Sequence, residues 1–188
     1  MTRHARYALD EYLRLEEYSN VKHEYLDGWI IAMAGGTPEH GAIAARIIAR
    51  LAAQLHGRPC NVYTSDVRVR VAATGLDTYP ELSVVCGEER RDSEDPNALA
   101  NPVVLVEVLS ASTEEYDRGE KLEHYQQIPS LREIALVSHR ESLVEVWRRD
   151  PTGPWRLDVA RAGGVARLDS IGCSLEVDPI YRDPLRGG

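Results

Sequence analysis

Apolar residues recur with a helical spacing in three segments of the chain. We expect helices over residues 8–18, residues 38–56 and about residues 115–128. The second has the clearest beginning, because Thr37 supplies a hydroxyl cap and Pro38 suits the first helical position. The third should stop before Pro129, since the residue ahead of a proline disfavours the helical conformation.

Other apolar segments alternate with polar residues or run without interruption, which is typical of β-strands. These strands are expected at residues 22–33, 67–71, 79–86, 102–109, 134–137, 143–147, 155–159 and 165–168. The first is a strand or a hairpin that turns at Asp27-Gly28, and the last three form an antiparallel meander. The run 102–109 is apolar on both faces, which predicts a central strand.

The order of these elements predicts an α/β (α+β) fold in which helices pack on a mixed sheet. The strand, helix and strand over residues 102–137 are a candidate for a right-handed crossover between parallel strands. The length of 188 residues suits a single domain, with a core over about residues 8–182. No apolar run approaches the roughly 20 residues of a membrane span, and the first residues lack the apolar core of a signal peptide.

The three cysteines, Cys60, Cys86 and Cys173, lie far apart in the sequence. Their odd number and the lack of a Cys-x-x-Cys pair argue against a disulfide framework and against a zinc site. We therefore expect three small buried side chains in a protein of the reducing cytoplasm.

The net charge of −8 lies entirely in the central third of the chain. Residues 61–130 carry six basic and fourteen acidic side chains, whereas the charges before and after this segment cancel. Part of the excess is a turn-like acidic run at residues 88–95, which is typical of a solvated loop. The alternation of Arg68 and Arg70 with valines predicts a half-buried strand with a basic face, either a phosphate contact or a surface without a partner.

Glu107 stands within a strand of branched aliphatic residues. A buried carboxylate is costly there unless it is paired or binds metal, so Glu107 either pairs with an arginine of a neighbouring strand or serves in a site. Glu81 opens another apolar strand, where alone it is weak evidence. Two adjacent strands that each bring one carboxylate to the same end can hold Mg²⁺, which prefers one or two carboxylates together with water and phosphate oxygens.

Lys121 lies one or two turns into the helix that follows Glu107. An ammonium at this place could stabilise charge that develops on a phosphate. The alternative is a surface lysine that pairs with Asp117 at the favourable i,i+4 spacing.

Five blocks of the sequence, taken together and in this order, resemble the Uma-type family of bacterial restriction-endonuclease-like proteins, in the PD-(D/E)XK superfamily. The blocks are residues 23–28, 35–41, 79–86, 101–113 and 116–125, of which 101–125 is the most specific. The resemblance extends over about residues 8–182. It implies a restriction-endonuclease-like core with metal-binding acids at Glu81 and Glu107.

The resemblance also implies roles for three residues outside the acid pair. The superfamily usually has a lysine two residues after the second acid, where this chain has Leu109, and Lys121 on the next helix takes its place. Glu24 matches a further acid near the metal, and His40 a residue that contacts phosphate or water. The family mostly has aspartate at the position of Glu81, and the extra methylene moves the carboxylate by about 1.5 Å in a site where Mg²⁺ demands near-ideal geometry.

We therefore expect an endonuclease that uses Mg²⁺ (or Mn²⁺) to hydrolyse phosphodiester bonds of DNA by water attack. The alternative is a weakened or inactive nuclease-fold protein that acts as an interaction or structural module. A zinc hydrolase is not favoured, because no His-x-x-x-His spacing occurs. The acidic balance predicts weak non-specific DNA affinity, and cutting both strands of a duplex, which needs two centres, favours a homodimer or higher homo-oligomer.

Overall fold

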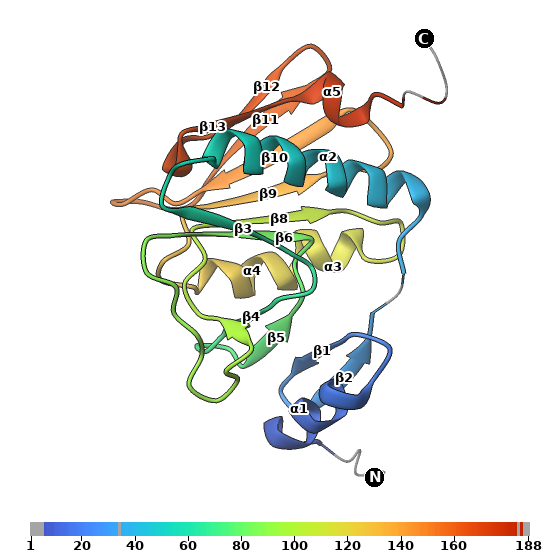
Figure 1. The fold of residues 1–188 in the computed structure, drawn as a ribbon, viewed down its shortest axis with the longest axis vertical. Helices are drawn as coiled ribbons and strands as arrows, with labels where there is room; N and C mark the ends of the chain where they lie inside the picture. The colour runs from blue at the N-terminus through green and yellow to red at the C-terminus, as the bar shows by residue number, and fades with distance from the viewer. Residues whose placement is uncertain (1–5, 34, 184, 186–188) are drawn as a thin grey trace.

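A six-stranded mixed sheet forms the centre of the molecule in the computed structural model, which describes residues 6–33, 35–183 and 185 (Figure 1). Its strand order is β11-β10-β9-β8-β6-β3. The strands are β3 (Cys60–Thr64), β6 (Leu82–Cys86), β8 (Val104–Val108), β9 (Glu133–Val137), β10 (Leu143–Arg148) and β11 (Arg156–Arg161). β8 and β9 are parallel neighbours, as expected, and β8 lies inside the sheet and is fully buried.

Helices cover both faces of this sheet. The alternation along β8 sends Val104, Val106 and Val108 toward α2 (Pro38–Leu55). Leu105 and Leu109 join the opposite cluster, beneath α4 (Glu120–Gln126). Because side chains along a strand alternate between faces, Glu107 belongs to the α4 side. Thr37 caps α2 by accepting a hydrogen bond from the His40 N–H, so the predicted beginning of this helix is confirmed.

A second sheet of five strands, in the order β2-β1-β5-β4-β7, lies beside the first. Its strands are β1 (His23–Leu26), β2 (Trp29–Ala32), β4 (Arg68–Val71), β5 (Leu76–Thr78) and β7 (Ala98–Leu99). The predicted hairpin at the edge of this sheet is confirmed, since Asp27 and Gly28 both have positive φ angles, of 48° and 85°. Helix α1 (Leu9–Tyr18) covers β1 and stacks Tyr12 on Tyr25, with ring centroids 5.1 Å apart.

Two predicted elements differ from those in the structure. The strand expected over residues 79–86 begins only at Leu82, the first residue of β6, whereas β5 ends at Thr78. Residues 79–81 between them carry the chain from the small sheet to the large one. The helix expected over residues 115–128 breaks at Gly119, whose φ of −104° and ψ of −107° are not helical, and this break separates α3 (Glu114–Arg118) from α4.

The C-terminal segment is antiparallel as expected, but its strands belong to two sheets. β10 pairs with β11, whereas β12 (Val165–Leu168) pairs with β13 (Cys173–Glu176), a strand that the alternation did not predict. Helix α5 (Val177–Tyr181) follows and packs with this pair on the α2 side of the large sheet. Among the helices of the described residues, none combines the length and the apolar character needed to cross a membrane.

The predicted basic face of β4 does not exist, because both of its arginines form ion pairs with acidic side chains and expose little of their own side chains. Arg68 binds Asp95 with two nitrogens, one of them 2.9 Å from Oδ1. Arg70 Nη1 lies 2.7 Å from Asp77 Oδ2, and Nη2 lies 2.9 Å from Glu94. The interpretation of these arginines as phosphate contacts is therefore wrong, and the acidic run at 88–95 is only partly a solvated loop, since Asp95 is 1% exposed.

Cys60 and Cys86 form a disulfide, contrary to the prediction of three free thiols. They face each other at the end of the antiparallel β3–β6 pair, with Cα atoms 4.0 Å apart. Strand pairing brings residues this close whatever their separation in the sequence, which is why the spacing was misleading. Only Cys173 is the small buried thiol that was expected. The cytoplasmic location stays a prediction, without support from the cysteines.

We expect the Arg70–Asp77 pair to be essential for stability. Asp77 is 0% exposed, and burial raises its pKa to about 6. Asp77→Ala leaves the Arg70 charge buried without its closest partner, so the free energy of unfolding should fall by about 3 kcal/mol, measured by urea denaturation at pH 7. As a control, Glu94→Ala removes a partner that is 66% exposed and should cost about 1 kcal/mol or less. Equal losses in the two variants would contradict this account.

Candidate active site

The pairing of β6 with β8 brings Glu81 and Glu107 together. These strands are antiparallel, with Leu82 opposite Val106, and one further step of the same register places Glu81 opposite Glu107. Both carboxylates line one pocket of about 560 Å³. The structure thus places the two acids at the same end of neighbouring strands, as the sequence predicted, although Glu81 belongs to the link between the sheets and not to a strand.

Lys121 is buried beside Glu107, with only 4% of its surface exposed. Its Nζ lies 3.0 Å from Glu107 Oε1, 2.8 Å from Glu24 Oε1 and 3.7 Å from Asp117 Oδ1. The pairing with Asp117 exists, but the interpretation as a surface lysine is wrong. The alternative of an arginine partner for Glu107 is wrong as well, because its cationic partner is Lys121. The helical spacing also directs Tyr125, four residues after Lys121, to Glu107 Oε1, to which its hydroxyl donates at 2.5 Å.

Glu24 reaches the site because the N-terminal hairpin pairs with the edge of the small sheet. Tyr25 of β1 lies opposite Asp77 of β5, so the next step of the register sets Glu24 opposite Thr78, whose hydroxyl donates to Glu24 Oε1. Glu24 is 7% exposed, and its second partner is Lys121. The hairpin is therefore part of the site and not only a cover.

His40 lies in the first turn of α2, on the rim of the same pocket. Its Nε2 is 2.7 Å from the Val108 carbonyl oxygen. Since a carbonyl can only accept, Nε2 carries the hydrogen. The same nitrogen is 3.3 Å from Glu81 Oε1. His40 therefore ties Glu81 to the end of β8, and a contact of His40 with phosphate or water stays a prediction.

Four carboxylates in this pocket share a single buried ammonium. Burial raises the pKa of Glu107 to about 7, although Lys121 acts in the opposite direction. Burial also raises the pKa of Glu81 and that of Asp117. For Lys121, burial alone would lower the pKa, but Glu107 and the other surrounding acids raise it well above its ordinary value. Lys121 has several partners of opposite charge, whereas the acids have too few. The raised pKa values of both kinds of group therefore indicate a site with too little positive charge for its carboxylates.

Several residues of the site were not identified from the sequence. Tyr125 stands four residues after Lys121, so the helical spacing of residues 115–128 could have indicated it, as it indicated the pairing of Lys121 with Asp117. Thr78 carried no signal, because it depends on the pairing of β1 with β5. Tyr116 and His139 also line the pocket, and they too had no recognisable pattern.

The donor set fits Mg²⁺ that keeps water and phosphate oxygens among its ligands. Within the described residues, no three His, Cys, Asp or Glu side chains are grouped so that they could hold a metal ion, which excludes a metal cage built from these side chains alone. Two carboxylates are nevertheless the usual protein contribution to a Mg²⁺ site. Lys121 and Tyr125 both contact Oε1 of Glu107, so neither contact occupies Oε2.

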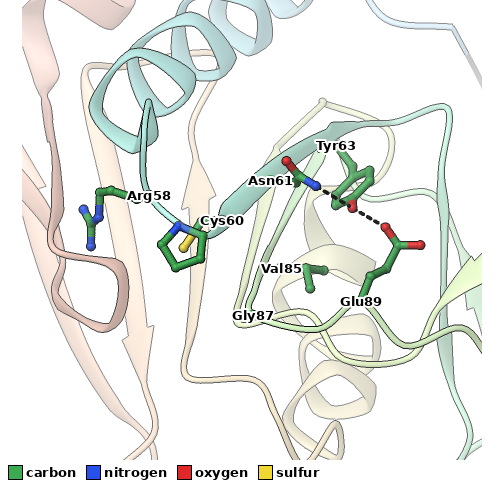
Figure 2. A pocket seen from close by; sticks show the side chains of 8 residues that line it. Arg58, Cys60, Asn61, Tyr63, Val85, Gly87 and Glu89 are labelled. Carbon is green, nitrogen blue, oxygen red and sulfur yellow. Dashed lines mark hydrogen bonds between the residues drawn. The ribbon is translucent and has the colours of Figure 1, made fainter.

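A second pocket, of about 190 Å³, lies beside the disulfide at the opposite end of the β3–β6 pair (Figure 2). Its lining includes Cys60, Tyr63 and Glu89, and the Tyr63 hydroxyl donates to Glu89. About 13 Å of strand separates Cys60 from the Glu81 end. None of the predicted site residues lines this pocket, so the larger pocket is the candidate active site.

A mixed sheet with helices on both faces, and with acids at neighbouring strand ends, defines a restriction-endonuclease-like fold. The chain belongs to the Uma2 family, described as "Putative restriction endonuclease", which it matches over residues 9–178. It is 38% identical to the uncharacterised protein slr1290 of Synechocystis sp. (strain ATCC 27184 / PCC 6803 / Kazusa), over 92% of this chain and 90% of that protein.

Two further likenesses agree with this assignment. A second uncharacterised Synechocystis protein, sll1609, is 29% identical over 78% of this chain and 83% of its own length. The crystal structure of a "putative nuclease belonging to DUF820" from Anabaena variabilis ATCC 29413 superimposes with a TM-score of 0.74. That likeness covers 92% of this chain and 96% of the other at 19% identity, so it supports the fold alone.

The raised pKa of Glu107 predicts a dependence of stability on pH. Between pH 4.5 and about 7 the folded protein keeps a proton that the unfolded chain releases, so this contribution to stability is present below pH 4.5 and lost as the pH rises through about 7. Glu107→Gln removes the titration and should flatten the fall in unfolding free energy by up to about 1.4 kcal/mol per pH unit. Urea denaturation from pH 5 to pH 7.5 in EDTA measures it, and parallel curves for the two proteins would refute the assignment.

Proposed function

We propose that the chain is a Mg²⁺- or Mn²⁺-dependent endonuclease that hydrolyses phosphodiester bonds of DNA. The observation that carries the proposal is the convergence of Glu81, Glu107 and Lys121 on one pocket. Membership of the Uma2 family supports it. An acid pair that can hold a divalent cation, beside a buried ammonium, suits phosphate chemistry, because the cation and the ammonium both offer positive charge to a substrate and a transition state that are anionic.

In this proposal Glu81 and Glu107 hold the metal ion. When bound, the ion supplies positive charge to the phosphate and lowers the pKa of a water nucleophile. Lys121 contributes a second positive charge from the helix side, and its raised pKa keeps that charge at neutral pH. The ammonium is held in place before substrate arrives, because Glu24 and Glu107 fix it from two directions.

Glu24 and His40 act in this proposal as positioning residues. Glu24 orients Lys121 and is itself oriented by the Thr78 hydroxyl. His40 links Glu81 to the Val108 carbonyl, which restrains a carboxylate that is one methylene longer than the family's usual aspartate. This restraint offers a physical reason why glutamate can serve at this position.

The proposed interaction with DNA is weak and depends on few basic side chains. Arg68 and Arg70 are already paired within the small sheet, and the chain carries a net charge of −8. Few counterions would be released on binding, so the dependence of affinity on salt should be shallow. Cutting both strands of a duplex requires two centres, and the proposal therefore includes a homodimer or a higher homo-oligomer.

A second candidate is a nuclease-fold protein without activity, which acts as an interaction or structural module. Two observations favour it: glutamate stands at position 81, and the described residues form no three-ligand metal group. The two candidates differ in whether the pocket binds a divalent cation.

Calorimetric titration separates the two candidates. Mg²⁺ or Mn²⁺ added to the wild type should bind at one saturable site, and Glu107→Gln should weaken this binding by at least about tenfold, the size of effect that even a supporting group has at a metal site. If neither protein shows site-specific binding, the catalytic proposal is to be abandoned.

A cleavage assay tests the roles of Glu107 and Lys121. Single- and double-stranded DNA is incubated with Mg²⁺ or Mn²⁺, and Glu107→Gln or Lys121→Met should lower the rate by at least about 100-fold, because each removes charge that faces the reacting phosphate. Methionine keeps the length of the lysine side chain without its charge.

The matched control for this assay is Glu133→Gln. Glu133 is also a buried strand carboxylate, 2% exposed, but it binds Arg148 and lies outside the pocket. It should keep most of the activity of the folded protein. Cleavage that survives Lys121→Met would remove Lys121 from the site, and equal loss in Glu133→Gln would indicate a general effect on folding.

A further inference from the structure

Strand β2 is the end strand of the small sheet, and no strand of the described residues covers its outer edge. Such an edge is a template for pairing with another chain, and most proteins protect it with charged residues or proline. Residues 29–36 contain neither. By contrast, β11 at the edge of the large sheet carries Arg156, Asp158 and Arg161. The edge of β2 is therefore open to a partner, whereas that of β11 is protected.

The backbone of β2 shows which of its groups point outward. The Met33 N–H donates to the Lys22 carbonyl at 2.9 Å, and the β1–β2 register sets these two residues opposite each other. Hydrogen-bonded and non-hydrogen-bonded pairs alternate along antiparallel strands, so Ile31 also bonds to β1. Ile30 and Ala32 instead direct their N–H and C=O groups away from β1, and no other backbone group of the described residues satisfies them.

The side chains of this segment form an apolar row that begins at the large pocket. Ile31 lies opposite Glu24 of β1, so Trp29, Ile31 and Met33 share the face of the hairpin on which Glu24 lies. Ile31 and Met33 line the pocket. Trp29 is 45% exposed and Ile31 is 51% exposed. The open edge of β2 therefore adjoins the candidate active site.

This edge is complementary to the same edge of a second copy. An antiparallel pair with a two-fold axis at Ile31 sets Ile30 of each copy opposite Ala32 of the partner subunit, and every outward group of these residues then gains a hydrogen bond. An axis at Ile30 would set Ala32 opposite Gly28 of the partner subunit. The Gly28 carbonyl already accepts from the Tyr7 N–H, so the axis at Ile31 is favoured.

We infer that β2 is the interface of a homodimer, in which two small sheets join across a two-fold axis at Ile31. In this register Ile31 contacts the partner's Ile31, and the partner's Trp29 lies opposite Met33, on the wall of the pocket. Pairs of aromatic and aliphatic side chains are favourable across strands. The inference rests on the homodimer that the proposed function includes, and not on cleavage itself.

The dimer would place both candidate active sites on one side of the joined sheet, because a two-fold axis perpendicular to a sheet does not exchange its faces. Three strand spacings then separate Glu24 from the partner's Glu24, which is about 14 Å. A duplex that meets one centre would thus lie close to the other. Each pocket would also be bordered by a side chain of the partner subunit.

Sedimentation velocity tests for the dimer in the full chain. Between about 2 and about 200 μM the mass of the wild type should rise from 21.0 kDa toward twice that value. β2 has only four residues, so its pairing buries less area than a standard interface and we expect a dissociation constant in the micromolar range.

A charge exchange at Ile31 tests the register. Because Ile31 faces its own copy, Ile31→Lys and Ile31→Glu should each weaken the dimer by at least about tenfold, since like charges then lie directly opposite each other. An equimolar mixture of the two variants should dimerise again, because opposite charges then meet. An interface in which position 31 did not face itself would not show this rescue.

Two further variants separate the edge from general effects. Leu157→Lys adds the same charge at a residue that is 42% exposed on the edge strand β11, and it should dimerise like the wild type. Ala32→Pro removes an N–H that points away from β1, so it breaks no hydrogen bond of the monomer but half of those across the interface. It should weaken the dimer while the circular dichroism spectrum stays that of the wild type.

Each outcome decides the inference. A wild type that stays at 21.0 kDa, an Ile31→Lys variant that dimerises normally, or a mixture that stays monomeric would overturn it. Cleavage of DNA by a monomeric wild type would overturn the interface and leave the nuclease proposal standing. A dimer that responds to the variants as expected but cleaves no DNA with any divalent cation would support the interface while the nuclease proposal fails.

Discussion

The buried ammonium of Lys121 is the interaction on which the rest of the site depends. A charge that is 4% exposed is stable only with partners of opposite charge, and Lys121 finds them on two different sheets, at Glu24 of β1 and Glu107 of β8. One ion-pair cluster therefore connects the N-terminal hairpin, the central strand and helix α4. If any of these three moves, the cluster loses a partner and leaves an uncompensated charge in the interior.

The same requirement explains two irregularities of the chain. The break at Gly119 ends α3. In the following helix, α4, the side chains of Lys121 and Tyr125 both contact Glu107. The link between β5 and β6 abandons strand pairing and delivers Glu81 to the end of β6 as the chain passes from one sheet to the other. Both irregularities lie next to a side chain that lines the pocket, Lys121 in one case and Glu81 in the other.

Much of the fold could be predicted from the sequence, because apolar spacing reports which face of an element is buried. It does not report what covers that face. Glu107 and Glu133 are both isolated carboxylates in apolar strands. Glu133, however, lies outside the pocket, where it binds Arg148 and accepts hydrogen bonds from the backbone N–H groups of Asp169 and Ser170. The difference between a structural and a candidate catalytic carboxylate lies in the pairing of distant segments, which the local pattern does not contain.

The acidic side chains of the protein should repel DNA less strongly than the net charge implies. In and beside the small sheet, the acids at 77, 92, 94 and 95 pair with Arg68 and Arg70, so the two arginines neutralise part of the excess internally. A second group of acids lies in the pocket, where Lys121 stands among Glu24, Glu81, Glu107 and Asp117. A nucleic-acid phosphate would be repelled from such a pocket until a divalent cation entered it. Under the proposed function, then, metal and nucleic acid must each strengthen the binding of the other, since coupling between two sites is reciprocal.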